Sequence, residues 1–173
     1  MYVQAKNAER SGVGHFTNWN ETGYFIKKLV HWESTTNSTN APTWKAYPWP
    51  EIRLAELYLS YAEALNEVNG GSSEAIAYLD KVRERAGLAG VVSSWTNFSK
   101  SPSKFQSQDG LREIIQRERL NELAFEGQRF WDLRRWKLAA EYLNQDITGF
   151  TITSKTAAGY NVERNVFNQT FIA

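Results

Sequence analysis

The sequence predicts a mostly α-helical fold with long loops and a few short strands. Apolar residues recur at intervals of three and four through residues 52–144, which is the periodicity of amphipathic helices. Elsewhere prolines, glycines and short polar residues dominate, and brief alternating segments appear near the end. We therefore expect one domain over residues 1–173, which is loop-rich in 1–51, helical in 52–144, and irregular with short strands in 145–173.

Composition limits the classes of function. With 42% hydrophobic residues, a chain of 173 residues is long enough for one well-filled core. A net charge of +1 is unlike the concentrated basic surface that binds nucleic acid or anionic membranes. The absence of cysteine excludes disulfides and thiolate metal sites, and the sequence has no apolar run of about 18 residues that would predict a membrane span.

Aromatic residues in segment 1–51 lie outside any helical periodicity. Trp32 and Trp44 flank a tract of Asn, Ser and Thr, and prolines from Pro42 onward prevent a regular helix. Two roles fit such tryptophans, stacking against sugar rings or burial against the helices. Trp49 stands just before the first helix and is expected to pack on it as a staple.

The first helix is predicted over Ile52–Val68, where apolar side chains share one face: Leu54, Leu57, Tyr58, Tyr61, Ala62 and Leu65. Asn69-Gly70-Gly71 ends it, and a second amphipathic helix is predicted over Glu74–Ala86 with Gly87 as its left-handed terminator. Two helices joined by so short a turn form a hairpin of the tetratricopeptide type. No clean repeat of about 34 residues is visible.

Segment 89–108 is polar and is expected to form a loop around Trp95 and Phe98. A loop of this length is usually functional or mobile. Two interpretations remain open for the aromatics, a platform for a sugar ring or a lid held against the surface. Asn97 lies between them as a candidate partner for sugar hydroxyls.

Two further helices are predicted over Leu111–Glu126 and Phe130–Asn144, with a break at Gly127. Charged residues of both signs crowd this stretch. Structural ion pairs are expected from four of them: Glu122, Glu126, Arg129 and Asp132. The last three are expected to fix the angle between the two helices. An acid–base or metal-binding pair of glutamates is the alternative, but no histidine stands near to complete a usual transition-metal set.

The end of the chain predicts short strands rather than helices. Thr148–Thr153 and Asn165–Ile172 alternate in polarity and are rich in β-branched or aromatic residues. Elsewhere, the sequence shows no phosphate-binding glycine loop and no nucleophile elbow, and His15 and His31 are isolated.

Three segments resemble, in order, the C-terminal half of SusD/RagB-type proteins: Arg53–Glu67, Val82–Leu88 and Glu118–Trp136. The resemblance covers approximately Gly23–Asn144 and implies an α-α superhelix of tetratricopeptide-like hairpins. Gly23–Leu29 resembles the extended piece that precedes these helices in the family, and it is expected to pair or pack.

Members of this family are surface lipoproteins of Gram-negative outer membranes. They capture oligosaccharides and pass them to a SusC-like TonB-dependent transporter, and the resemblance implies the same role here without a cofactor or a metal. It also implies that the chain is a fragment. The signal sequence, the lipid-accepting cysteine that would be its only membrane anchor, and the proline-containing ending of the family are not present.

Three function classes remain open. A glycan-capture protein would use aromatic and polar side chains on loops, whereas a tetratricopeptide-like adaptor would bind a peptide on its concave face. A glycoside hydrolase would need two carboxylates about 5–10 Å apart across a cleft, but the acids on these helices have basic neighbours at helical spacing. We rank non-catalytic glycan binding first, with these candidate residues: Trp95, Phe98, Asn97, Trp44 and Trp32.

Overall fold

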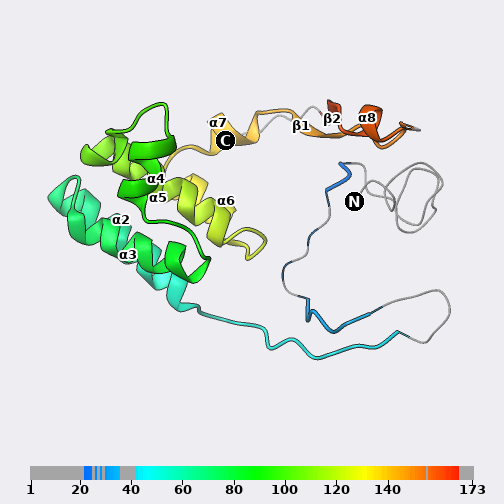
Figure 1. Ribbon diagram of the computed structural model, residues 1–173, viewed down its shortest axis with the longest axis horizontal. Coiled ribbons are helices and arrows are strands. Elements are labelled where there is room, and N and C mark those ends of the chain that lie inside the picture. The colour runs from blue at the N-terminus through cyan, green and yellow to red at the C-terminus, as the bar shows by residue number, and fades with distance from the viewer. Residues whose placement is uncertain are drawn as a thin grey trace. The chain divides into compact units, whose positions relative to one another are not determined.

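A computed structural model of the chain describes residues 22–24, 26, 28, 30–35, 42–154 and 156–167. The chain divides into two compact units. We call Pro48–Trp131 the helical unit, and the described residues of 1–47 and 132–167 the strand unit. Each has its own apolar cluster, and helices make up most of the regular structure (Figure 1). The prediction of a mostly α-helical fold is confirmed.

The helical unit begins with a hairpin of α2 (Leu54–Asn69) and α3 (Ser73–Arg85), which lie side by side in Figure 1. The buried face of α2 follows helical spacing: Ala55, Leu59, Ala62 and Asn66. This face matches the predicted stripe only in part, because Leu54, Leu57 and Tyr61 are exposed. Ala55 and Ala62 on the buried face leave room for a neighbouring helix to approach closely, and Leu59 between them is fully buried.

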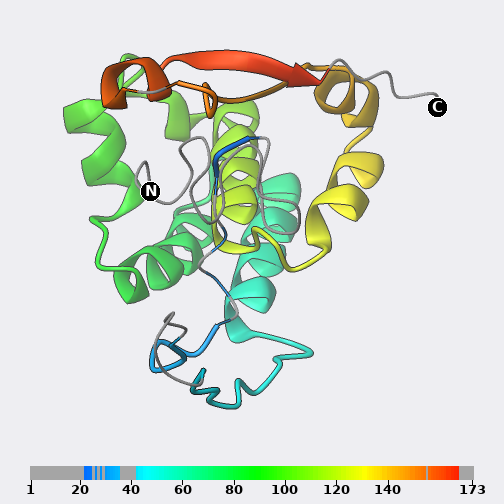
Figure 2. The same cartoon turned by 90° about the vertical axis from the view of Figure 1, so that its right-hand side faces the viewer.

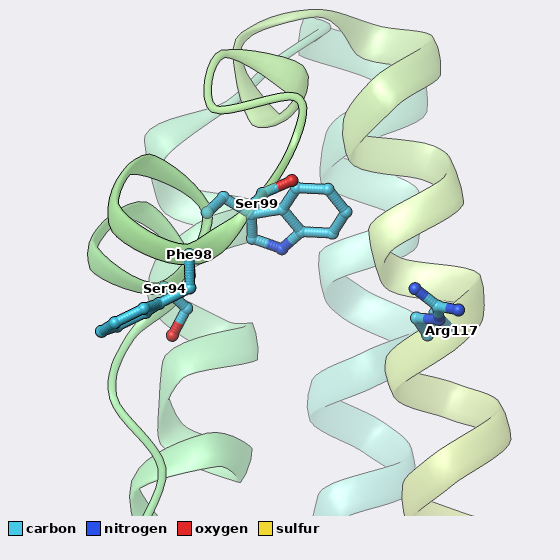
Figure 3. Close-up of a pocket in the computed structure, with 5 residues that line it drawn as sticks. Ser94, Phe98, Ser99 and Arg117 are labelled. Carbon is cyan, nitrogen blue, oxygen red and sulfur yellow. The ribbon is translucent and has the colours of Figure 1, made fainter.

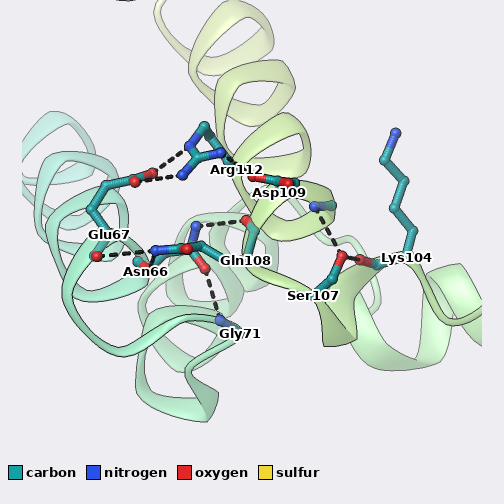
Figure 4. Close-up of polar contacts among 9 residues, drawn as sticks. Asn66, Glu67, Gly71, Lys104, Ser107, Gln108, Asp109 and Arg112 are labelled. Carbon is teal, nitrogen blue, oxygen red and sulfur yellow. Dashed lines mark hydrogen bonds and ion pairs between the residues drawn. The ribbon is translucent and has the colours of Figure 1, made fainter.

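The turn between α2 and α3 is fixed by two glycines and a buried asparagine. Gly70 and Gly71 have φ angles of 48° and 64°, which glycine adopts without strain. The Asn66 side chain accepts from the Gly71 N–H at 3.1 Å and donates to the Gln108 carbonyl at 2.9 Å (Figure 4). The Gln108 side chain donates to the carbonyls of Asn66 and Glu67, both at 3.0 Å, so the end of α2 is bonded to the start of α5 (Gln108–Glu122).

Segment 89–108 contains helical structure, so the prediction of a loop is wrong. It forms α4 (Val91–Phe98) and a short 3-10 turn, η1 (Lys104–Gln106). The first N–H of α4 donates at 2.7 Å to the carboxylate of Asp80 on α3, so the cap comes from another helix. A Cβ on Gly90 would lie 2.7 Å from this carboxylate, and glycine therefore leaves room for the cap.

The helix α5 (Gln108–Glu122) completes the core of the helical unit. Its buried face joins the cluster of α2 and α3 through three side chains: Leu111, Ile114 and Ile115. Ser107 caps its first turn by accepting from the Gly110 N–H at 3.1 Å. Glycine is needed there, because a Cβ on Gly110 would lie 1.9 Å from the Lys104 carbonyl oxygen.

The helix α5 is followed by the predicted break at Gly127, which has a φ of 81° and is confirmed. Phe125 also has a positive φ, 65°. Because the chain leaves the right-handed helical region before Gly127, α5 ends at Glu122 rather than at the predicted Glu126.

The single helix predicted over Phe130–Asn144 is wrong, because this stretch forms α6 (Gln128–Arg135) and α7 (Ala139–Leu143). Lys137, between the two helices, has a φ of 60°. The apolar periodicity continues across this interruption, so the sequence pattern alone does not reveal it.

The strand unit contains an antiparallel pair, β1 (Ile147–Phe150) and β2 (Glu163–Phe167), with the short helix α8 (Ala157–Tyr160) between them in the chain (Figure 2). Each strand overlaps a predicted one and begins earlier. The rest of the second predicted strand, beyond Phe167, lies outside the described residues.

An early segment of the chain packs on this pair. The Phe150 N–H donates to the Thr22 carbonyl at 2.8 Å, and the Tyr160 hydroxyl donates to the Gly23 carbonyl at 3.1 Å. The Tyr24 ring lies 4.7 Å from that of Phe150. The expectation that the segment beginning at Gly23 pairs or packs is confirmed for these described residues.

Candidate functional site

A shallow, solvent-open hollow lies between α4 and α5 in the helical unit. Its volume is about 280 Å³, and its lining residues are Ser94, Trp95, Phe98, Ser99 and Arg117. Figure 3 shows Arg117 on α5, across from the labelled residues of the α4 segment. Aromatic rings, hydroxyls and one cation therefore share a single open surface.

Arg83 on α3 holds α4 in place. Its Nε donates to the Ala89 carbonyl at 2.8 Å, and one Nη donates to the Ser94 hydroxyl at 2.9 Å. The other Nη pairs with Glu118 on α5, and only 12% of the Arg83 side chain and 14% of the Glu118 side chain are exposed. One charge-assisted network thus fixes α4 relative to both neighbouring helices.

Trp95 and Phe98 differ in how much surface they present. Trp95 is half-buried against the core, and the Lys104 ammonium lies 5.7 Å from its ring centroid. Phe98 is 86% exposed at the end of α4. Asn97 donates its amide N–H to the Ser93 carbonyl at 2.9 Å and does not line the hollow. Two of the three candidate residues of this segment are therefore brought together.

Trp32 and Trp44 belong to the strand unit and are 84% and 71% exposed. Both roles considered for them, stacking against a sugar ring or burial against the helices, stay predictions. Trp49 is also exposed, so the prediction that it packs as a staple on the first helix is wrong.

A second polar cluster surrounds Arg53 at the start of α2. Its guanidinium donates to Glu122 at 2.8 Å and to Glu126 at 2.7 Å, and Arg85 donates to Glu122 at 2.7 Å. The hydrogen bond to Glu126 raises the pKa of Arg53 above its ordinary value, although burial acts in the opposite direction. Glu122 at the end of α5 therefore binds arginines at the start of α2 and the end of α3, and Glu126 in the turn after α5 binds Arg53.

Asp132 is buried and pairs with Arg135 at 2.8 Å, within α6. The role of Asp132 and Arg129 in setting the angle between helices stays a prediction. Among the residues that the structure describes, no group of three or more His, Asp or Glu is placed to hold a metal ion. No helix in the same described ranges is long and apolar enough to cross a membrane.

Comparison with known protein families covers almost the whole chain. The SusD family profile matches residues 6–172. The chain belongs to the SusD family. The resemblance noted in three sequence segments is thereby confirmed.

Curated relatives match part of this SusD-family chain. SusD-like protein P2 of Formosa agariphila is 47% identical over 90 residues, which cover 52% of this chain and 17% of that protein. SusD-like protein P25 of the same organism is 41% identical over 96 residues, which cover 56% of this chain and 16% of the relative. Both alignments therefore span less than a fifth of the relatives' own length.

A solved structure supports the fold of the SusD-family chain. BT4246 superposes with a TM-score of 0.71 at 27% sequence identity, covering 94% of this chain and 25% of BT4246. The chain thus corresponds to a quarter of that structure.

Sequence reasoning did not single out three lining residues of the hollow in this SusD-family chain, Ser94, Ser99 and Arg117, or Arg83, which holds α4 in place. Arg117 is one of many charges around α5, and the partner of each depends on which helix it faces. Glu118, its neighbour in sequence, pairs with Arg83 on α3. The spacing of Val91 and Trp95, four residues apart, was the available signal for α4.

Proposed function

We propose that the chain is part of a non-catalytic protein of the outer membrane that captures an oligosaccharide or polysaccharide at the cell surface. Membership of the SusD family supports a role in glycan binding and nutrient uptake. In this proposal, the protein delivers the glycan to a SusC-like TonB-dependent transporter and is anchored by an N-terminal lipid. The observation that carries the proposal for these residues is the open hollow beside Trp95 and Phe98.

Stacking on the two aromatic rings is the main physical basis of the proposal. The apolar faces of sugar rings pack on flat side chains, and a platform that is fixed before binding loses little entropy when the ligand arrives. Arg83 and Asp80 hold α4 from outside, so the two rings stand on a rigid element. The hollow, at about 280 Å³, is small and open. It suits a short part of a longer glycan better than an enclosed small molecule.

Affinity gel electrophoresis in a panel of soluble polysaccharides tests this function. We expect at least one polysaccharide to retard the chain, and Phe98→Ala and Trp95→Ala to abolish the retardation. Phe98 is the sharper variant, because its exposed ring contributes little to folding. Trp49→Ala is the matched control, since Trp49 is an exposed aromatic of the same unit outside the hollow. If no polysaccharide retards the chain, or if Trp49→Ala loses the retardation to the same extent as Phe98→Ala, the proposal is contradicted.

A second candidate, a peptide-binding adaptor, rests on the outer face of α2. Leu54, Leu57 and Tyr61 are exposed there at helical spacing, and an amphipathic partner helix could cover them. Leu57→Glu distinguishes the candidates. An adaptor would lose its peptide partner and would show no glycan binding in any variant, whereas a glycan-binding protein would keep its retardation in the gel. Release of reducing sugar would instead indicate a hydrolase.

A further inference from the structure

The charges around the hollow are not balanced. Two cations near it have carboxylate partners, since Arg83 pairs with Glu118 and Lys104 pairs with Glu113. Arg117 forms no hydrogen bond or ion pair with any residue in the described part of the chain. The described lining residues include no acid. Arg117 therefore leaves an uncompensated positive charge at the hollow (Figure 3).

Most of the side-chain hydrogen-bonding groups that remain available in the hollow are donors. The Ser94 hydroxyl already donates to the Ala89 carbonyl at 3.1 Å and accepts from Arg83. Ser99 Oγ accepts from the Ser101 N–H at 3.0 Å, which leaves its O–H to donate. The Trp95 indole N–H has no acceptor among the described residues, and a guanidinium carries only donors.

We infer that the hollow recognises an anionic saccharide, in which a carboxylate or sulfate group binds Arg117 while the sugar ring packs on Trp95 and Phe98. This inference rests on the proposed function and names its ligand class. Guanidinium binds an oxyanion through two parallel N–H donors, so it fixes orientation as well as charge. The indole N–H of Trp95 and the hydroxyl of Ser99 supply further donors on the α4 side.

A neutral sugar fits the same groups less well. Its hydroxyls are donors as well as acceptors, and the described side chains of the lining offer few acceptors for them, because each serine oxygen has already accepted one hydrogen bond. Polar groups that lose water without gaining a partner lower affinity. An oxyanion presents acceptors only, and so it matches the lining.

Isothermal titration calorimetry with two matched ligand pairs tests the inference. One pair is oligogalacturonate and its methyl ester, and the other is a carrageenan oligosaccharide and its desulfated form. We expect the chain to bind the anionic member of one pair about tenfold more tightly, since charge-assisted hydrogen bonds are about twice as strong as neutral ones. The pair that shows the preference identifies the anion as carboxylate or sulfate.

Variants of the chain separate a specific contact from general charge attraction. Arg117→Gln should weaken binding of the anionic member about tenfold and binding of the neutral member less, so that the preference for the anionic member is lost. Lys100→Gln removes the same charge from an exposed position next to Ser99 that does not line the hollow, and it should keep the preference. Added salt should weaken the anionic ligand more than the neutral one.

The outcomes distinguish this inference from the proposed function. If the chain binds neutral and anionic members equally, or if Lys100→Gln and Arg117→Gln lose the preference equally, the inference is overturned and glycan binding stands. If Arg117→Gln weakens both members to the same extent, Arg117 acts as an ordinary donor and the anionic class is wrong. If Phe98→Ala also leaves all glycan binding unchanged, the site itself is misplaced.

Discussion

The Arg83 guanidinium donates a hydrogen bond of 2.9 Å to the Ser94 hydroxyl, and so α3 holds the helix that carries Trp95 and Phe98. Replacing Arg83 would leave the carboxylate of Glu118 largely buried and without its arginine partner. Because breaking a fully buried pair costs about 3–5 kcal/mol and this one is partly exposed, we expect Arg83→Ala to lower the free energy of unfolding by about 2–3 kcal/mol. Urea denaturation measures this.

Arg112→Ala is the control for Arg83. Arg112 pairs with Glu67 at 2.6 Å and with Asp109, but these carboxylates are well exposed. Exposed pairs contribute about 0.2–1 kcal/mol. Equal losses in the two variants would show that Arg83 has no special role in holding α4.

Two opposing effects act at Gly110, near the start of α5: helix propensity favours alanine, whereas close packing requires glycine. In an exposed helix, alanine is more favourable than glycine by about 1 kcal/mol. At this position a Cβ would lie 1.9 Å from the Lys104 carbonyl oxygen. We therefore expect Gly110→Ala to destabilise the chain by about 3 kcal/mol, the upper part of the range for overpacking.

Gly87→Ala gives the comparison for Gly110. A Cβ on Gly87 would have no neighbouring atom within 4 Å, but the backbone φ of 72° at this position is strained for any residue other than glycine. Such strain costs about 1–2 kcal/mol. Thermal unfolding should therefore rank Gly110→Ala below Gly87→Ala in stability, and the opposite order would mean that the chain around Lys104 moves aside easily.

Arg53 and Glu126 form a pair that joins the start of α2 to the turn after α5. Their side chains are 22% and 14% exposed, so we expect a coupling free energy of about 1–2 kcal/mol from a double-mutant cycle of Arg53→Ala and Glu126→Ala. The pair of Glu122 with the more exposed Arg85 should couple by less than about 1 kcal/mol. Arg129→Ala removes a residue for which the sequence predicts a structural ion pair, and its effect on the melting temperature can be measured in the same series.

Tyr160 should make the strand unit sensitive to alkali. Burial raises the pKa of its hydroxyl above the ordinary value of 10.0. The unfolded chain therefore loses this proton first, so the contribution to stability is fully present below about pH 10 and is lost as the pH rises through the folded pKa. Tyr160→Phe, which keeps the ring but cannot ionise, should lose less stability between about pH 9 and pH 11. Parallel stability curves for the two proteins would contradict this assignment.

Local signals in the sequence were sufficient to predict the hairpin of α2 and α3. The apolar spacing in each helix and the Asn-Gly-Gly turn act within a few residues, as does the cap that Ser72 forms by accepting from the Ala75 N–H at 3.4 Å. The structure contains both helices close to their predicted bounds. The break at Gly127 was predictable for the same reason. Each of these features depends on the preference of a residue for its own backbone conformation.

Features that depend on partners distant in sequence were not predictable. The cap of α4 comes from Asp80, on another helix, so segment 89–108 was predicted as a loop. The buried face of α2 contains Leu59 together with small and polar residues, whereas Leu54 and Leu57 are exposed, so the apolar stripe alone did not predict which face is buried. The availability of Arg117 also depends on where Glu118 and Glu113 point.

The capping of α4 by a side chain of α3 couples recognition to folding. Asp80 and Arg83 hold α4 in place only when α3 is formed. A ligand that binds the hollow therefore binds the folded chain and not the unfolded one. At a free ligand concentration of 100 times Kd, such selective binding stabilises the folded state by about 2.7 kcal/mol. A thermal-shift screen could therefore identify the natural glycan from unlabelled polysaccharides, because the melting of the helices themselves would report occupancy.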